Sequence, residues 1–250
     1  PDGLTAIARR VNKLTAELAA HVTNNGYELG STSFFDTITI HTTQASVLAD
    51  NLEDSGVNVR RTNADQIGIS LDETSTVATL GTIASVLTPN VPLVSIDQEF
   101  TCIPDSSSRI TRFLQHPVFN TYKSETSMLR YLRKLSDKDI ALDRSMIPLG
   151  SCTMKLNATT EMEPITWSEF ANIHPFAPLD QAQGYVELIR ELEGFLVEIT
   201  GYDAVSLQPN AGSQGEFAGL LAIKAYLESI GQPNRDICLI PSSAHGTNAA

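Results

Sequence analysis

The segment 201–216 constrains the fold more than any other part of this chain, because it combines a strand pattern, a tight turn and the start of a helix. The pattern predicts a short strand over 204–207, a turn at 208–211 and a helix that begins near Ser213. A second strand is predicted at 236–240. Strand, helix and strand would form a βαβ unit, so the loops that follow the two strands are expected at one edge of a parallel sheet, where α/β proteins bind ligands.

The loop before the predicted helix has the composition of an anion site. Its run Asn210-Ala-Gly-Ser-Gln-Gly-Glu216 places glycines next to a helix start, where backbone N–H groups lack helical partners and the helix dipole is positive. The run lacks the Lys-Ser/Thr ending of a P-loop, and Gly212, Gly215 and Gly219 do not fit the GxGxxG dinucleotide fingerprint. On its own, a glycine-rich helix start without a ligand is as good an interpretation as a phosphate site.

A histidine in the second loop favours a ligand. His245 follows the strand predicted at 236–240, and its ring could stack on a planar group whose phosphate is held at Ser213 and Gln214. A phosphorylated aromatic cofactor would fit both loops. The sequence therefore predicts such a cofactor at this edge of the sheet.

Composition excludes several functional classes. The formal net charge of −12 argues against nucleic acid or an anionic membrane surface as a partner, and no apolar run approaches the roughly 18 residues of a membrane helix. Three widely spaced cysteines, Cys102, Cys152 and Cys238, form no pair and no metal-ligand spacing with the histidines, so we expect no metal site and a reducing compartment. No leader is visible, and a chain running from Pro1 to Ala250 in this way is expected to be part of a longer protein.

The remaining periodicities divide the chain into three parts. Residues 1–95 are expected to form a small α+β domain, residues 96–145 a connector with one helix, and residues 146–250 the start of a larger α/β domain. The predicted helices span 4–21, 44–55, 74–87, 124–135 and 184–199, and the further strands 34–41, 58–61 and 66–71. Few clean patterns occur over 146–178, and such long irregular stretches often line sites or interfaces.

Four runs of this sequence closely resemble one family. Met146-Ile-Pro-Leu-Gly-Ser-Cys-Thr-Met-Lys-Leu-Asn157, Gly201-Tyr-Asp-Ala-Val205, the run 208–216 and Ser243-Ala-His-Gly-Thr-Asn248 resemble the pyridoxal-phosphate-dependent glycine decarboxylases, the P-proteins of the glycine cleavage system. The similarity extends upstream to about residue 34. It implies an α/β, aminotransferase-like fold of two tandem halves, with this chain spanning their junction: the small domain that ends the first half, the connector, and the start of the second, cofactor-bearing half.

The resemblance also implies a cofactor site. Gly212, Ser213 and Gln214 would hold the phosphate of pyridoxal 5'-phosphate, His245 would pack against the pyridine ring, and Thr247 is a weaker candidate for a contact. The family more often has Ser-Gly-Ala-Gln where this chain has Ala-Gly-Ser-Gln, and Pro where it has Ala249. Because a helix start binds phosphate mainly through backbone N–H groups, Ser213 should preserve or add a contact.

The family's cofactor-binding lysine lies in a motif that these residues do not contain. Lys224 falls inside a predicted helix, and Lys155, although it lies in the specific 150–157 run, is not that lysine in the family. No catalytic residue is therefore expected before Ala250, and the chain alone is not expected to be active. The roles of Ser151, Cys152, Thr153 and Lys155 stay open.

The resemblance implies an oxidoreductase that decarboxylates glycine, releases carbon dioxide and passes the aminomethyl group to the lipoyl arm of the H-protein. It also implies contact with the remainder of its own chain, a homodimer, and a location in the bacterial cytoplasm, or in the mitochondrial matrix of a eukaryote. Two alternatives remain open: another pyridoxal-phosphate enzyme, such as an aminotransferase or lyase, and a non-catalytic partner subunit without the lysine.

Overall fold

The computed structural model describes residues 1–93, 102–138 and 158–242, and it divides into two compact units, Pro1–Leu156 and Asn157–Ala250. Each unit is described by itself. The domain boundaries expected from the sequence stay predictions. The coarse class is confirmed for the described residues, which contain helices and a small antiparallel sheet.

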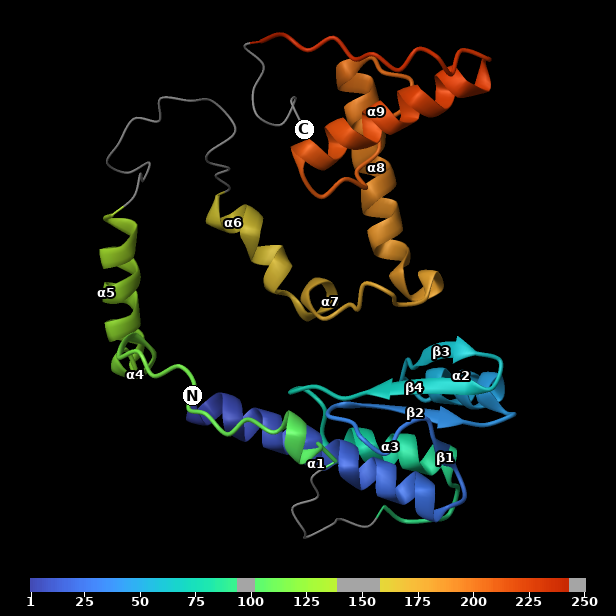
Figure 1. Ribbon diagram of the computed structural model, residues 1–250, viewed down its shortest axis with the longest axis vertical. Helices are drawn as coiled ribbons and strands as arrows, with labels where there is room; N and C mark the ends of the chain where they lie inside the picture. The colour runs from blue at the N-terminus through green and yellow to red at the C-terminus, as the bar shows by residue number, and fades with distance from the viewer. Residues whose placement is uncertain (94–101, 139–157, 243–250) are drawn as a thin grey trace. The chain divides into compact units, whose positions relative to one another are not determined.

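The first unit is built on a sheet of four antiparallel strands (Figure 1). Their order is β1 (Glu28–Leu29), β2 (Thr37–His41), β4 (Gln66–Ser70) and β3 (Arg60–Asn63). In the β2–β4 pair Ile38 lies opposite Ile69 and Ile40 opposite Ile67, so these four side chains share one face of the sheet. All four are buried, which makes this face the floor of the core.

Three amphipathic helices cover that face (Figure 1): α1 (Asp2–Asn24), α2 (Ala45–Asp54) and α3 (Val77–Leu87). Each places apolar residues three or four positions apart toward the sheet, for example Leu14, Leu18 and Val22 of α1. Leu18, Leu52 and Leu80 are completely buried, and each such side chain contributes about 1.5–3 kcal/mol by leaving water. The helices and strands expected over 1–95 are thus confirmed, with boundaries shifted by a few residues; the two-residue strand β1 was not anticipated.

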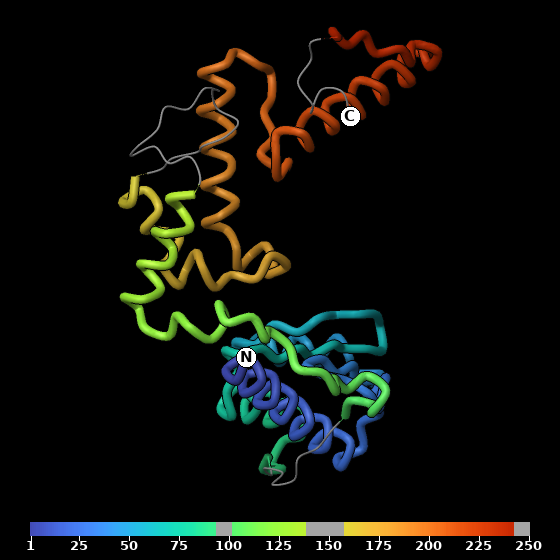
Figure 2. The backbone as a smooth tube through the Cα atoms, turned by 60° about the vertical axis from the view of Figure 1, so that its left-hand side comes forward, coloured from blue at the N-terminus to red at the C-terminus, as the bar shows by residue number. Residues whose placement is uncertain are grey.

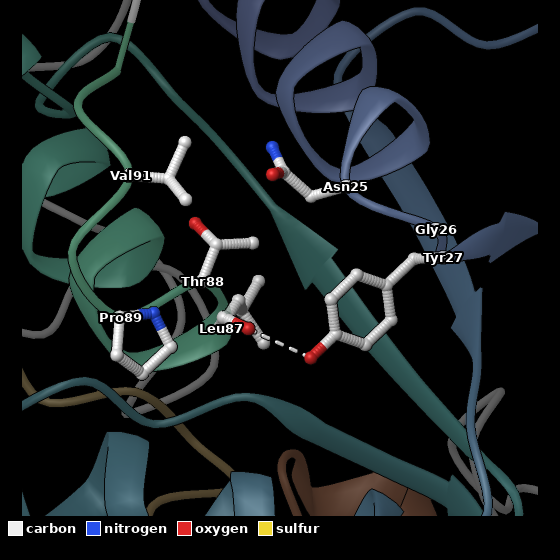
Figure 3. Close-up of a pocket in the computed structure, with 7 residues that line it drawn as sticks. All are labelled: Asn25, Gly26, Tyr27, Leu87, Thr88, Pro89 and Val91. Carbon is white, nitrogen blue, oxygen red and sulfur yellow. Dashed lines mark hydrogen bonds between the residues drawn. The ribbon is translucent and has the colours of Figure 1, made fainter.

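Polar contacts join the carboxyl ends of α1 and α3. His21 and Thr88 are both buried and share a hydrogen bond of 2.6 Å between Nε2 and Oγ1, while the Thr88 hydroxyl donates to the carbonyl of Ala84 at 2.9 Å. Close by, the Tyr27 hydroxyl donates to the Leu87 carbonyl at 2.7 Å (Figure 3). These contacts fix the two helix ends against each other.

The rest of the first unit carries three short elements, a 3-10 turn η1 (Asp105–Ser107), α4 (Val118–Thr121) and α5 (Glu125–Ser136). The expected N-cap of α5 is confirmed, because the Ser124 hydroxyl accepts from the Ser127 N–H at 3.2 Å. The apolar side chains of α5 lie on one face but remain exposed. Cys102 is buried, and its carbonyl accepts from the N–H of Phe34.

The second unit consists of helices joined by loops (Figure 2). They are α6 (Thr159–Met162), η2 (Glu163–Thr166), α7 (Ser168–Ala171), η3 (Leu179–Ala182), α8 (Gln183–Thr200) and α9 (Gly212–Ser229). Gly201 ends α8 with φ 72°, a left-handed conformation that glycine adopts without a steric cost. No residue of 158–242 is buried, so the described part of this unit has no core.

The prediction of a βαβ unit is wrong in one respect. The helix between the expected strands is present as α9, but neither 204–207 nor 236–240 forms a strand. A strand exists only where a neighbour accepts and donates its backbone hydrogen bonds, and residues 158–242 offer none. The side chains of Ile237 and Leu239 are 85% and 91% exposed, which is the state of a core strand without its sheet.

Candidate cofactor-binding site

Three of the five predicted site residues form the first turn of α9. Gly212, Ser213 and Gln214 are its first three residues, after Ala211 at the N-cap. The other two, His245 and Thr247, lie outside the described residues, as does the specific run 150–157. The structure therefore brings the predicted phosphate-binding residues together and leaves their pairing with the histidine a prediction.

The backbone explains why the helix begins at this point. Ala211 is extended, with φ −153° and ψ 161°, and its carbonyl accepts the first helical hydrogen bond, from the N–H of Gly215 at 3.0 Å. The N–H groups of Gly212, Ser213 and Gln214 come before that bond, so helix geometry gives them no partner inside α9. They are the donors that an anion would find at this end.

The surroundings of this turn suit a negative ligand. Ala211 has no side chain that could cap the helix, and no carboxylate occurs in the first turn. A Cβ placed on Gly212 would meet nothing within 4 Å in the described structure, so the approach to the amides is open. With the positive end of the helix dipole added, this donor set fits a phosphate group.

Side chains hold the loop that leads into α9. The N–H of Leu207 donates to Oε1 of Glu193 at 3.2 Å, and the N–H of Gln208 donates to the Ser206 hydroxyl at 3.3 Å. Gln214 reaches back from the first turn, where its Oε1 accepts from the N–H of Asn210. The sequence assigned Gln214 to the phosphate; in the structure its side-chain oxygen binds the loop, and its backbone N–H remains at the helix end.

Glu193 was not anticipated from the sequence. It lies on α8, fourteen positions before Leu207, among several other acidic residues of the same helix. No spacing or motif marks it, since an acidic residue on an exposed helix is ordinarily a solvated one. Only the fold brings its carboxylate to the loop.

The lysine of this helix is remote from its first turn. Lys224 lies twelve residues after Gly212 within α9, which at 1.5 Å per residue is about 18 Å along the axis. The expectation that Lys224 lies in the helix interior is confirmed, and that it is not the cofactor-binding lysine stays a prediction. Lys155 lies outside the described residues.

A cavity of about 250 Å³ lies in the first unit (Figure 3). This cavity lies at the carboxyl ends of α1 and α3. Its lining residues are Asn25, Gly26, Tyr27, Leu87, Thr88, Pro89 and Val91. Burial raises the pKa of the Tyr27 hydroxyl above its ordinary value, and likewise the pKa of the Cys102 thiol. Both groups are therefore neutral near pH 7.

Residues 1–93, 102–138 and 158–242 contain no cluster of three or more histidine, cysteine or acidic side chains able to hold a metal ion. Over the same residues no helix is both long and apolar enough to cross a membrane.

Comparison with known proteins identifies relatives along the whole chain. Residues 1–87 match the family model described as glycine cleavage system P-protein. Over its whole length the chain is 54% identical to a glycine dehydrogenase (decarboxylating) of Xanthomonas euvesicatoria and 55% identical to proteins of that name from Stenotrophomonas maltophilia and Variovorax paradoxus. The chain spans 26% of the length of each of these relatives. These matches confirm the resemblance seen in the sequence.

Proposed function

We propose that the protein containing this chain is a pyridoxal-phosphate-dependent enzyme that decarboxylates glycine and transfers the aminomethyl group to the lipoyl arm of the H-protein. The observation that carries this proposal is identity of 54–55% over all of the chain to proteins named glycine dehydrogenase (decarboxylating). Other pyridoxal-phosphate enzymes would share a phosphate loop but would not be expected to match along the whole chain.

Within this function the first turn of α9 would hold the cofactor phosphate. The backbone N–H groups of Gly212, Ser213 and Gln214 supply three donors, and the Ser213 hydroxyl is a fourth. His245 and Thr247, by resemblance, would contact the ring from the loop after 236–240. When bound, pyridoxal phosphate supplies the electron sink that accepts the electron pair left by carbon dioxide.

The part played by these residues is to bind and orient. A fixed phosphate and a stacked imidazole at His245 define a plane, and the bond to be broken must stand perpendicular to it. Within residues 158–242 the one lysine is Lys224, twelve residues into α9, so covalent attachment would come from elsewhere in the complete protein. We also propose that the complete protein is a homodimer, and that residues 146–250 begin its cofactor-bearing half.

The test uses the complete protein, reconstituted with pyridoxal phosphate and lipoylated H-protein. With carboxyl-labelled glycine we expect release of labelled carbon dioxide that depends on all three components. His245→Ala should weaken cofactor binding and slow the release. If the loaded wild-type protein releases no carbon dioxide from glycine, or instead transfers the amino group to a keto acid, the proposed function is wrong.

A further inference from the structure

The backbone N–H groups of the loop before α9 all donate to side chains. Of its four residues 207–210, Pro209 has no N–H, and the N–H groups of the other three all donate to side-chain oxygens. The acceptors are Oε1 of Glu193, Oγ of Ser206 and Oε1 of Gln214.

Two of these side chains lie at opposite ends of the loop. Glu193 projects from α8 and is half-buried, and it binds the first residue of the segment. Gln214 is the third residue of α9, and it binds the last residue of the segment. The turn between them is therefore fixed at both ends, once from the preceding helix and once from the helix that it opens.

The position of Pro209 agrees with this arrangement. A Cβ placed on Gly215 would lie 3.8 Å from Cβ of Pro209, so the proline ring lies beside the first turn of α9 with room for about one methyl group between them. The segment thus lies close to the helix start.

We infer that Glu193 and Gln214 are positioning residues for phosphate binding: they hold segment 207–210 so that the amides of Gly212, Ser213 and Gln214 point to one anion. This inference rests on the proposed function, because it takes the phosphate to be that of pyridoxal phosphate. It assigns to the Gln214 side chain a role within the loop in place of a direct contact, and it gives Glu193 a role that its sequence context does not suggest.

The experiment compares two ligands of the complete apoprotein, pyridoxal phosphate and pyridoxal, which differ only in the phosphate. The dissociation constants are measured by equilibrium dialysis, so no catalytic turnover is needed. For Glu193→Ala and Gln214→Met we expect the affinity for pyridoxal phosphate to fall about two- to tenfold, as expected for one lost hydrogen bond. The affinity for pyridoxal should be unchanged, because the ring contacts are not affected.

Two matched variants separate this role from others. Glu193→Gln keeps the Oε1 acceptor while removing the charge, so it should retain the wild-type ratio of the two affinities. Glu191→Ala removes a carboxylate two residues earlier on α8 and should also leave the ratio unchanged. The inference is overturned if Glu193→Ala behaves like Glu191→Ala, or if both ligands lose affinity by the same factor.

Hydrogen exchange of the wild-type apoprotein gives a readout that does not depend on any variant folding. The amides of Leu207 and Asn210 donate hydrogen bonds and should exchange more slowly than those of Gly212 and Ser213. Equal exchange at all four would contradict the inference. A wild-type protein that shows no preference for pyridoxal phosphate over pyridoxal would instead overturn the proposed function, and the inference with it.

Discussion

Removal of the hydrogen bond between His21 and Thr88 tests most directly how the first unit is stabilised. Both side chains are more than nine-tenths buried, and the Thr88 hydroxyl has two partners: it donates to the Ala84 carbonyl and meets Nε2 of His21. Since its one proton goes to Ala84, the imidazole N–H must be the donor to Oγ1. Thr88→Val keeps the shape of the side chain and removes only the oxygen.

The expected cost follows from what is left behind. Thr88→Val creates no cavity, but it leaves the imidazole N–H of His21 buried without an acceptor, which costs about 1–3 kcal/mol. For a domain of 60–100 residues each kcal/mol lowers Tm by roughly 4–8 °C. We therefore expect Tm to fall by roughly 4 to 24 °C, and Thr88→Ser, which keeps the hydroxyl, to lose much less.

The assay is thermal unfolding for Tm and urea unfolding for the free energy, both on residues 1–93. Far-UV circular dichroism follows the transitions, because the one tryptophan of the chain, Trp167, lies in the second unit. A double-mutant cycle isolates the pair: once Thr88 is Val, His21→Leu should cost less than it does in the wild type, since the orphaned donor disappears with the ring. A loss below about 0.5 kcal/mol for Thr88→Val, or additive effects of the two substitutions, would refute the reasoning.

Three other outcomes are expected. Residues 1–93 should unfold cooperatively when expressed alone, whereas residues 158–242 should bind a hydrophobic dye and show no cooperative transition; the same calorimetric scan on both fragments decides this. Tyr27→Phe should lower the free energy of unfolding by about 0.5–1.5 kcal/mol, because the hydrogen bond to Leu87 is lost. Burial raises the pKa of Tyr27, so this stability difference should be complete below the pKa of an unfolded tyrosine and diminish as pH rises through the pKa of Tyr27 in the folded protein. The pKa of Asp72 lies below its ordinary value, chiefly because the Thr74 hydroxyl donates to its carboxylate. Asp72→Asn should therefore destabilise the unit at neutral pH, and the stability difference from wild type should shrink as pH falls through the pKa of Asp72 in the folded protein. Equal pH profiles for wild type and variant would contradict this.

Helices could be predicted from this sequence because their signals are local. The spacing of Leu14, Leu18 and Val22 defines one face of α1, and the Ser124 hydroxyl marks the start of α5 before any tertiary contact exists. The helix that begins at Gly212 was predicted within one residue, because a turn followed by a helical pattern is also a local signal.

Strands were predicted correctly only where the chain supplies their partners. β3 and β4 form a hairpin across a short turn, and β2 pairs with β4, so all three find neighbours within forty residues of each other. The segments 204–207 and 236–240 have the composition of core strands but no neighbour among residues 158–242. Their composition therefore indicates that these segments can form core strands, but a strand forms only where a neighbouring strand is present to pair with it.

The contrast between the two units also bears on the candidate site. The core of the first unit is closed: its sheet face and its three helices bury one another, and polar contacts such as His21–Thr88 satisfy the groups enclosed with them. The second unit carries the candidate phosphate turn, yet none of its described residues is buried, and Phe195, Ile199 and Phe217 are more than 60% exposed. Without a core, packing cannot fix the loop before α9, so hydrogen bonds from side chains are what define its shape. Glu193 and Gln214 supply those bonds at its two ends, and a turn held in this way keeps its amides aligned for an anion even before neighbouring structure covers the helices.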